Sequence, residues 1–383
     1  EGAVIIFPAG EVSRLRPGGV RDGRWHSGFL RLAAQTQAPI VPIHIDGRNS
    51  ALFYGASLCY KPLATLLLVQ EMFGQHRKSI ALRIGHPIPH SSHGAMPLPD
   101  AAKAKLFCKH LYRVAQDRPG LLHTETAVAH PVDRSALAQA VGACALLGQT
   151  PDGKRIHLFR GALDSPVLRE VGRLRELAFR AVGEGSGRRR DLDRYDLIYD
   201  HLILWDPQDL EIVGAYRMVR TAAVVQDQGV EGLYTHSLFQ FGPRMVPYLQ
   251  QGLELGRSFV QPRYWGRRSL DYLWFGIGAY VRRYPECRYL FGPVSLSRDM
   301  PQAARDLLVH HYRSHYGEPG VAEARRPYVP GSDLETVASG DSSADFVRLK
   351  HLLAHLGCSV PTLYKQYTEV AEPGGVRFLD FGV

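Results

Sequence analysis

The sequence has 383 residues, of which 45% are hydrophobic and 22% charged, with a formal net charge of +9. This length suits two domains, and this composition excludes a disordered chain. No apolar run reaches the ~18 residues that a membrane-spanning helix needs.

Charge and cysteine usage narrow the class of partner and the compartment. Positive charge is concentrated in residues 1–150, which suits an anionic membrane surface or an acidic carrier protein. Because no DNA- or RNA-binding motif accompanies this charge, no nucleic-acid partner is expected. Five Cys without a Cys-x-x-Cys motif predict reduced thiols in a cytoplasmic protein. The pairs His310-His311 and His351/His355 lack a carboxylate or Cys at ligand spacing, so no metal site is expected.

The chain begins with a strand–helix–strand pattern. Apolar runs at residues 4–7 and 39–45 predict two buried strands, and apolar residues at 29–33 predict a helix between them. Such a unit favours a parallel sheet. The chain lacks an initiator Met and a signal peptide ahead of the first predicted strand, so we expect a fragment of a longer protein.

Two more helices and a connector follow. Residues 63–73 are apolar, and we expect a helix in the core of the domain, with a segment on a membrane surface as the alternative. Residues 100–116 predict a basic amphipathic helix that closes the domain. Pro and Gly punctuate residues 118–154, which contain one short Ala-rich helix and predict a connector. The predicted division is 1–117, 118–154 and 155–383.

The first of these parts carries a family signature. The motif Phe7-Pro8-Ala9-Gly10, then Ser13-Arg14 and later Val41-Pro42, resembles the third and fourth blocks of the lysophospholipid (glycerolipid) O-acyltransferases over roughly residues 1–115. The resemblance implies that Glu11 and Arg14 contact the phosphate of a lysolipid acceptor. The family's catalytic His and Asp belong to an earlier block, and its third-block Glu is Ala9 here. We therefore expect a truncated α/β domain that does not perform O-acyl transfer alone.

Residues 155–383 predict a second α/β domain. Helical spacing covers 167–182, and strands at 202–205 and 211–219 flank a turn as a hairpin. Residues 253–260 predict a strand, and the helix that begins at Leu270 has Ser269 as its expected N-cap. Residues 364–370 and 376–381 predict a terminal hairpin.

Two groups of charged residues are candidates for substrate binding. Asp193 and Asp196 lie beside three consecutive Arg, which is usual for a solvated loop but also suits recognition of an amino group. Arg217 stands among apolar neighbours in its strand and needs an anionic partner.

A phosphate site is predicted between the strand at 253–260 and the following helix. The first amides of a helix lack internal partners and attract anions, and a Gly with two Arg in this loop adds to the effect. The candidate ligands are Gly266, Arg267, Arg268 and Ser269. An ordinary strand–loop–helix connection is the alternative.

The order of these features resembles a second family. The segments that carry the resemblance are Arg175-Glu176-Leu177-Ala178-Phe179, Asp193-Arg194-Tyr195-Asp196, Gly214-Ala215-Tyr216-Arg217, Glu254-Leu255-Gly256-Arg257-Ser258, Tyr289-Leu290-Phe291-Gly292 and Leu363-Tyr364-Lys365-Gln366-Tyr367. As a set they resemble acyl-homoserine-lactone synthases and, more closely, the ornithine-lipid N-acyltransferases of the GNAT superfamily. The resemblance implies a mixed-sheet GNAT fold over 155–383.

The resemblance also implies a chemistry. An amine must lose a proton to attack a thioester, and Glu254 is the candidate base. The oxyanion would be held by a backbone N–H near Gly256–Ser258, which makes Ser258 a candidate catalytic residue with Arg257. A bulge at Gly256 would bring Glu254 and Arg257 together; otherwise Arg257 pairs with Asp193 or Asp196. A scaffold ion pair between Glu254 and Arg257 is the non-catalytic alternative.

The expected activity is transfer of a (3-hydroxy)acyl group to the α-amine of ornithine. The donor implied is acyl carrier protein through its phosphopantetheine arm, with acyl-coenzyme A as the other option, and no permanently bound cofactor is expected. The partners implied are acyl carrier protein, ornithine, a lysolipid and an anionic membrane, with the protein peripheral on the cytoplasmic face of the inner membrane. The alternatives are another amino acid, homoserine lactone synthesis, or a non-catalytic binding module.

Overall fold

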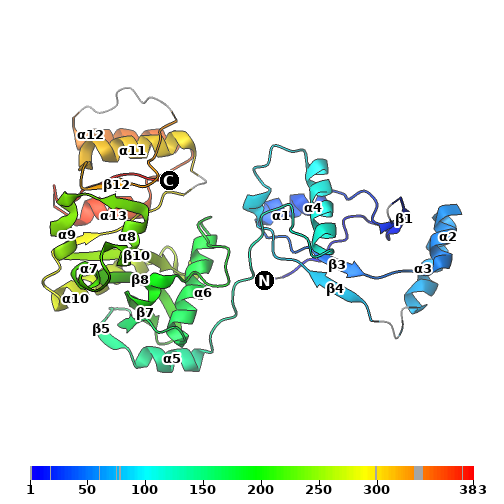
Figure 1. The fold of residues 1–383 in the computed structure, drawn as a ribbon, viewed down its shortest axis with the longest axis horizontal. Coiled ribbons are helices and arrows are strands. Elements are labelled where there is room, and N and C mark those ends of the chain that lie inside the picture. Colours follow the sequence, from blue (N-terminus) through cyan, green and yellow to red (C-terminus); the bar gives the residue numbers. More distant parts are fainter. Residues whose placement is uncertain are drawn as a thin grey trace. The chain divides into compact units, whose positions relative to one another are not determined.

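The chain divides into two units, Glu1–Ala127 and Val128–Val383, and each is described by itself (Figure 1). The computed structural model describes residues 2–17, 19–59, 61–74, 76, 79–297, 300–331, 340–372 and 374–383. Both units mix helices and strands, so the predicted α/β class is confirmed.

The first unit is a small α/β assembly around one helical core. Its main elements are β1 (Arg14–Arg16), β2 (Gly19–Arg21), α1 (Gly28–Thr36), β3 (Ile43–Asp46), α2 (Ala51–Cys59), α3 (Lys61–Gly74), β4 (Ala81–Ile84) and α4 (Asp100–Val114). The predicted helices at α1 and α4 are confirmed, because their apolar faces pack together through Phe29, Ala104 and Phe107.

Three expectations for this unit are wrong. Residues 4–7 are not a strand, and Ile5 is 78% exposed; an apolar run alone does not supply the paired partner that a strand requires. The sheet is antiparallel, since β3 pairs with β4 in the register Ile43↔Ile84. The helix at 63–73 exists as α3, but Leu66, Val69 and Phe73 are exposed rather than in a core.

The second unit is built on a six-stranded mixed sheet with the order β11-β10-β8-β7-β6-β5. The strands are β5 (Ala145–Gln149), β6 (Arg155–Arg160), β7 (Asp200–Asp206), β8 (Glu211–Arg220), β10 (Gly252–Val260) and β11 (Tyr289–Phe291). Only the β10–β11 pair is parallel. Helices α5 (Arg134–Gly142) and α6 (Pro166–Arg180) pack on one face and α10 (Ser269–Arg283) on the other (Figure 1).

The predicted connector is too long. α5 and β5 lie inside residues 118–154, yet β5 is the edge strand of the sheet and α5 packs beside α6. Leu137 and Val141 of α5 are buried in that core, which an Ala-rich pattern does not reveal. The second unit therefore begins at Val128.

The remaining elements surround the sheet at its β11 end. They are α7 (Thr221–Gln228), α8 (Tyr234–Leu238), β9 (Phe239–Phe241), α9 (Val246–Gln250), α11 (Gln302–Tyr316), β12 (Ala322–Ala324), α12 (Ser342–His355) and α13 (Thr362–Val370). The predicted terminal hairpin is wrong, because residues 364–370 belong to the helix α13. Tyr364 and Tyr367 lie on one helical face and pack against Tyr312 and Trp274, respectively.

β10 is interrupted where it leaves its neighbour. It pairs with β11 only as far as Glu254↔Phe291. Its pairing with β8 then shifts register between Gly256 and Phe259, and Arg257 adopts a left-handed φ of 50°. A Cβ at Gly292 would overlap the carbonyl oxygen of Leu255, so only glycine lets the chain after β11 turn away this closely. Of the two possibilities left open by the sequence, a regular strand or a bulge at Gly256, the structure therefore shows the bulge.

Across the part of the chain that the structure describes, no helix combines the length and apolar character needed to cross a membrane.

Candidate functional site

Glu254 lies buried at the last position of β10 that pairs with β11, with 1% of its surface exposed. Its Oε1 accepts hydrogen bonds of 2.6 Å from both the backbone N–H and the hydroxyl of Thr235. Its Oε2 accepts one from the Tyr199 hydroxyl at 2.5 Å. Thr235 comes from α8 and Tyr199 precedes β7, so three elements converge on one carboxylate.

The environment of Glu254 is one that suits a general base. Burial raises the pKa of Glu254, although hydrogen bonds from Thr235 and Tyr199 oppose this effect. Burial and the adjacent Glu254 carboxylate raise the pKa of Tyr199, so this phenol keeps its proton and donates a hydrogen bond to Glu254. A carboxylate with a raised pKa accepts a proton at neutral pH more readily than an exposed one.

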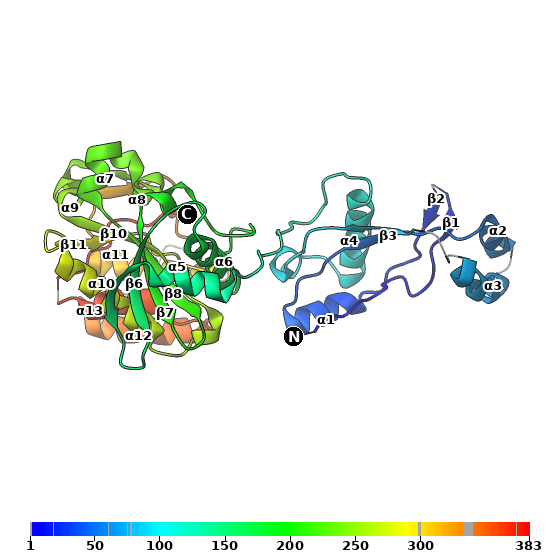
Figure 2. The same ribbon diagram turned by 90° about the horizontal axis from the view of Figure 1, so that it is seen from below.

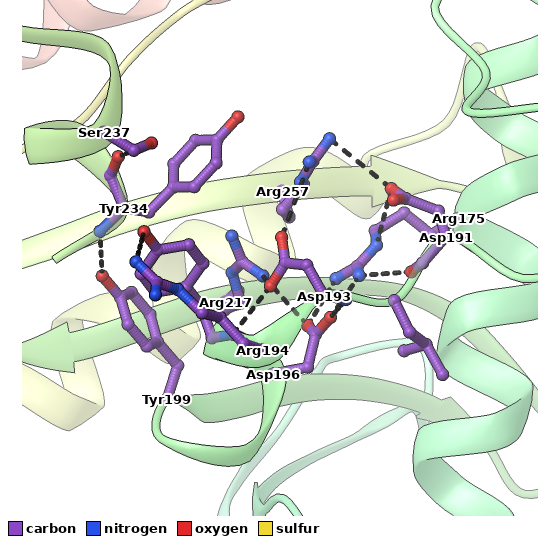
Figure 3. A network of polar contacts seen from close by, with 12 residues as sticks. Arg175, Asp191, Asp193, Arg194, Asp196, Tyr199, Arg217, Tyr234, Ser237 and Arg257 are labelled. Carbon is purple, nitrogen blue, oxygen red and sulfur yellow. Dashed lines mark hydrogen bonds and ion pairs between the residues drawn. The ribbon is translucent and has the colours of Figure 1, made fainter. Parts of the chain in front are cut away.

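A network of three Arg and three Asp lies beside this carboxylate (Figure 3). Arg175 Nη2 reaches Asp196 Oδ2 at 2.8 Å and its Nε reaches Asp191 Oδ2 at 3.0 Å. Arg217 Nη1 lies 2.6 Å from Asp193 Oδ1 and 3.2 Å from Asp196 Oδ1. Asp196 is thus shared by two buried guanidinium groups.

The local sequence explains why the aspartates face inward. Asp193 and Asp196 form a capping box around the short helical turn Arg194–Leu197. The Asp193 side chain accepts from the backbone N–H of Tyr195 at 2.9 Å, and Asp196 accepts from the backbone N–H of Asp193 at 2.7 Å. The solvated-loop interpretation is therefore wrong for Asp196, which is 1% exposed.

Ion pairing keeps Asp196 and Arg217 charged. Burial alone would raise the pKa of Asp196, but the hydrogen bonds and charge of Arg175 and the charge of Arg217 hold it well below the usual range. The carboxylates of Asp196 and Asp193 raise the pKa of Arg217 against the opposing effect of its burial. Both partners stay charged at neutral pH, so the network is a rigid ionic scaffold.

Arg257 and Asp193 form the accessible rim of the network. Their side chains are 27% and 23% exposed, and Arg257 lies 3.6 Å from Asp193 and from Asp191. Its guanidinium stacks 5.3 Å from the ring centre of Tyr234, whose backbone N–H donates to Tyr199. The bulge at Gly256 was expected to bring Arg257 to Glu254, but Arg257 pairs with Asp193, as was expected only for a strand without the bulge.

Several residues of this site were not predicted. Tyr199, Thr235 and Tyr234 have no charge, and in the sequence they look like ordinary core or loop residues. Arg175 and Asp191 stand in segments that carried the resemblance or adjoined it, but neither was singled out as a site residue. The one sequence signal that could have found Tyr199 is its place just after the acidic segment Asp193–Asp196.

The predicted catalytic residue Ser258 lies on the other side of the β10 interruption. Together with Arg257 it falls outside the paired register of β10 and β8. Its hydroxyl hydrogen-bonds Tyr216, which also meets Tyr367 of α13 hydroxyl to hydroxyl at 2.8 Å. Ser258 therefore lines the sheet face covered by α10 and α13, whereas Glu254 faces α8.

The predicted phosphate loop has part of the expected geometry. Gly266 has a φ of 73° at the turn, and Arg267 and Arg268 are exposed ahead of α10. Ser269 is not the N-cap; Arg268 holds that position without a capping side chain, and Ser269 is buried in the first turn. The open N-terminus of α10 leaves backbone donors for an anion.

In the first unit, Glu11 and Arg14 form an ion pair of 3.3 Å. Arg14 also donates to the Ser57 hydroxyl of α2 at 2.6 Å. The side chain of Arg14 is 13% exposed, so it is largely committed to these partners. Their assignment to a lysolipid phosphate stays a prediction.

A cavity of about 490 Å³ opens in the second unit beyond the end of β11. Val182, Val294, Met300 and Leu363 give it apolar walls, and Ser295 contributes a hydroxyl that bonds Glu184 at 2.9 Å. The predicted absence of a metal site was an expectation from spacing, and no His, Cys, Asp or Glu cluster of metal-binding type occurs among the residues that the structure describes.

Comparison with known families separates the two units. Residues 174–275 match the acetyltransferase (GNAT) domain, and residues 1–97 match a family described as acyltransferase. No solved structure matches the chain.

Curated relatives extend the match. A glycine N(alpha)-acyltransferase of Phocaeicola vulgatus is 34% identical over 226 residues, covering 54% of this chain and 69% of the relative. The chain belongs to the GNAT-type N(alpha)-acyltransferase family. It spans about two thirds of the length of the glycine N(alpha)-acyltransferases that it matches.

Relatives with other named activities match shorter segments of the chain. An L-ornithine N(alpha)-acyltransferase of Brucella abortus is 34% identical over 145 residues, 33% of this chain and 50% of the relative. A lyso-glycine lipid O-acyltransferase of Phocaeicola vulgatus is 38% identical over 92 residues, 22% of this chain and 33% of the relative. The expected fusion of an O-acyltransferase-like part to a GNAT domain, and the acyltransferase class, are confirmed.

Proposed function

We propose that residues 128–383 transfer a fatty acyl group from acyl carrier protein to the α-amine of an amino acid. The observation that carries this proposal is the buried Glu254 carboxylate beside a rim formed by Asp193 and Arg257. A free amino acid carries an ammonium and a carboxylate on adjacent atoms. Asp193 complements the first charge and Arg257 the second.

The ammonium nitrogen must lose two protons, and the acyl group must pass from sulfur to nitrogen. The ammonium gives a proton to Glu254, and because Glu254 is 1% exposed this proton travels through a water molecule. The amine nitrogen then attacks the thioester carbonyl, the carbon–sulfur bond breaks, and the thiolate leaves on the carrier arm. The nitrogen loses its second proton as the amide forms, and the departing thiolate takes up that proton.

The interruption of β10 supports the attack. The register shift puts Arg257 and Ser258 outside the regular pairing with β8, and β11 pairs no further than Glu254. A backbone N–H turned out of a strand in this way can donate to the oxyanion of the tetrahedral intermediate. Glu254 and this donor then act on opposite sides of the same carbonyl.

The donor site rests on the loop before α10. Arg267 and Arg268 supply two charges near the open helix N-terminus, which suits the single phosphate of a phosphopantetheine arm. The cavity beyond β11 is of a size and apolar character that suit a fatty acyl chain, and its hydroxyl groups suit a 3-hydroxyacyl chain. Acyl-coenzyme A is the alternative donor.

Two acceptors deserve a direct comparison. Ornithine follows from the sequence resemblance. Glycine is favoured by two observations: the glycine N(alpha)-acyltransferase relatives align over more of this chain than the ornithine relatives do, and the network pairs three Arg with three Asp. Because the positive and negative charges of the network are equal in number, its rim can bind the α-amine and the α-carboxylate of an amino acid. The network has no extra negative charge to pair with the side-chain ammonium of ornithine. In the intact protein the first unit would esterify a second chain onto the lysolipid product.

The test is an acylation assay of the purified chain with acyl carrier protein carrying a 3-hydroxyacyl group. Glycine and ornithine are offered separately, and the amide product is measured by mass spectrometry. Glu254→Gln should lower kcat by about 100-fold or more, because removing a general base costs 10²–10⁴-fold. Arg267→Ala with Arg268→Ala should raise the KM for the acyl carrier protein and leave kcat largely unchanged.

Two outcomes would contradict the proposal. A folded Glu254→Gln variant with full activity would remove Glu254 as the base. An absence of amide product with either acceptor, while the chain still binds acyl carrier protein through Arg267 and Arg268, would support the non-catalytic binding module instead.

A further inference from the structure

The helices α2 and α3 of the first unit present apolar faces to solvent. On α2 the exposed residues Ala51, Leu52, Gly55, Leu58 and Cys59 share one side of the helix. On α3, Leu66, Val69 and Phe73 follow the spacing i, i+3, i+7 and are 77%, 62% and 70% exposed. Figures 1 and 2 both show the two helices side by side at the end of this unit farthest from α1 and α4.

This exposure is not the result of a loose segment. Phe53 of α2 is fully buried, and the hydroxyl of Ser50 accepts from the backbone N–H of Phe53 at 3.1 Å. Glu71 of α3 accepts a hydrogen bond of 2.7 Å from the backbone N–H of Ser50. These contacts fix the helical pair with its apolar side chains outward.

Residues 51–74, which include the helical pair, contain two charged residues, Lys61 and Glu71. Glu71 accepts hydrogen bonds from Ser50. The neighbouring β1–β2 hairpin is basic. Its register places Arg14 opposite Arg21, so Arg14, Arg16 and Arg21 share one face, and Arg14 ties the hairpin to Ser57 of α2. Arg16 and Arg21 are exposed.

We infer that α2 and α3 dock on an anionic lipid surface, with Leu66, Phe73 and Leu52 among the acyl chains and Arg16 and Arg21 at the headgroups. α2 has nine residues and α3 fourteen, and a span needs about 20, so the pair lies in the plane of the interface. Apolar burial supplies the depth and arginine the preference for anionic lipid. This inference does not depend on the proposed amine acylation.

The test measures binding of the full chain to vesicles by co-sedimentation. Vesicles of phosphatidylcholine mixed with phosphatidylglycerol should bind the chain, and vesicles of phosphatidylcholine alone should bind it less. The double variant Leu66→Asp/Phe73→Asp should lower the partition coefficient at least about tenfold, because two apolar side chains that would enter the acyl region are replaced by charged ones. The matched control is Leu32→Asp on α1, where the side chain is 39% exposed, and it should bind as the parent does.

A second measurement needs no charged substitution. Cys59 is exposed on the outer face of α2, so an environment-sensitive fluorophore attached there should shift to the blue when anionic vesicles are added. Cys59→Ser, labelled in parallel, corrects for dye on other thiols. Added salt should weaken binding, because Arg16 and Arg21 act through screened charge.

Three results would overturn the inference. One is vesicle binding by the folded Leu66→Asp/Phe73→Asp variant that equals binding by the parent. Another is co-sedimentation without any change at Cys59. The third is a dimer in light scattering that dissociates in the double variant while neither protein binds vesicles, which would assign the surface to a second copy of this chain.

Discussion

Asp196 shows how a single side chain organises the candidate site. It accepts from Arg175 and Arg217 and from the backbone of Asp193, with 1% of its surface exposed. Without it, two guanidinium groups would face each other in a buried space. The partly exposed Asp193 and Arg257 keep their geometry because this inner carboxylate neutralises the charges behind them.

We therefore expect Asp196→Asn to destabilise the second unit by about 3–5 kcal/mol, the usual cost of removing one partner of a buried ion pair. Urea unfolding followed by circular dichroism measures this. The control is Asp164→Asn, which removes the 3.1 Å ion pair of an exposed residue with Arg169 and should change stability by less than about 1 kcal/mol. Equal effects of the two variants would mean that Asp196 is not the centre of the network.

The same residue predicts a dependence of stability on pH. Burial opposes ionisation of Asp196, but Arg175 and Arg217 depress its pKa in the folded state below the unfolded value of about 3.9. Its contribution is therefore complete above that value and is lost as the pH falls through and below it. Thermal unfolding of the parent should show this acid loss, and Asp196→Asn should show a smaller one.

At the scale of elements, the site depends on the early divergence of β10 and β11. Their parallel pairing ends at Glu254↔Phe291, and Gly292 passes directly against the backbone of Leu255. The chain after β11 is then free to form the apolar wall that begins at Val294. The divergence of β10 and β11 therefore depends on the close approach of two backbone segments and not on side-chain packing.

Gly292→Ala should therefore disturb this divergence. The added Cβ would overlap the Leu255 carbonyl, and we expect a loss of stability of about 1–3 kcal/mol with a lower kcat. Gly278→Ala is the control, because no atom lies within 4 Å of a Cβ there and the position is inside α10. That change should stabilise the helix by up to about 1 kcal/mol. Denaturation of both variants in parallel makes the comparison.

Regular elements were predictable where pattern and pairing agree. The strands β7, β8 and β10 lie inside the sheet, α6 and α10 pack on its two faces, and all five have periodic apolar residues. The strand predictions for residues 4–7 and 364–370 were wrong, because a short apolar run fits a strand, a helix or an exposed segment equally well. Tertiary partners decide between these, as α13 shows by packing Tyr364 against Tyr312.

Four charged residues of the site were singled out in the sequence, whereas Arg175 and Asp191 were not. Arg217 stands out because a charge among apolar residues needs a partner, and Glu254, Asp193 and Asp196 belong to segments that carry the family resemblance. The pairing between these charged residues could not be predicted from the sequence. Asp196 is shared by Arg175 and Arg217 because a capping box holds its carboxylate between them. The roles of Glu254, Arg257 and Ser258 in catalysis stay predictions.

At the scale of the molecule, the chain consists of two units with separate cores. The residues proposed for amine acylation all come from the second unit. The first contributes Glu11, Arg14 and the exposed pair α2–α3. Lipid contact and amine chemistry are thus assigned to different parts of the chain.

This division predicts that residues 128–383 alone retain amine acylation. With a soluble acyl carrier protein and a free amino acid, kcat/KM should stay within about threefold of the full chain, because no residue of the proposed site is removed. Calorimetry of the full chain should show two transitions, of which one persists in the shortened protein. A complete loss of activity in a folded 128–383 protein would show that the first unit completes the site.

The backbone conformation at Arg257 is one that glycine adopts more easily than arginine does. Its φ of 50° lies in the left-handed region, where glycine is free of strain and other residues are not. The usual ranking of substitutions in a strand is therefore reversed: Arg257→Gly should unfold at a higher temperature than Arg257→Ala, although both lose the rim guanidinium. A search for thermostable variants would select glycine at 257 and lose the activity, so stability and acylation have to be screened together at this position.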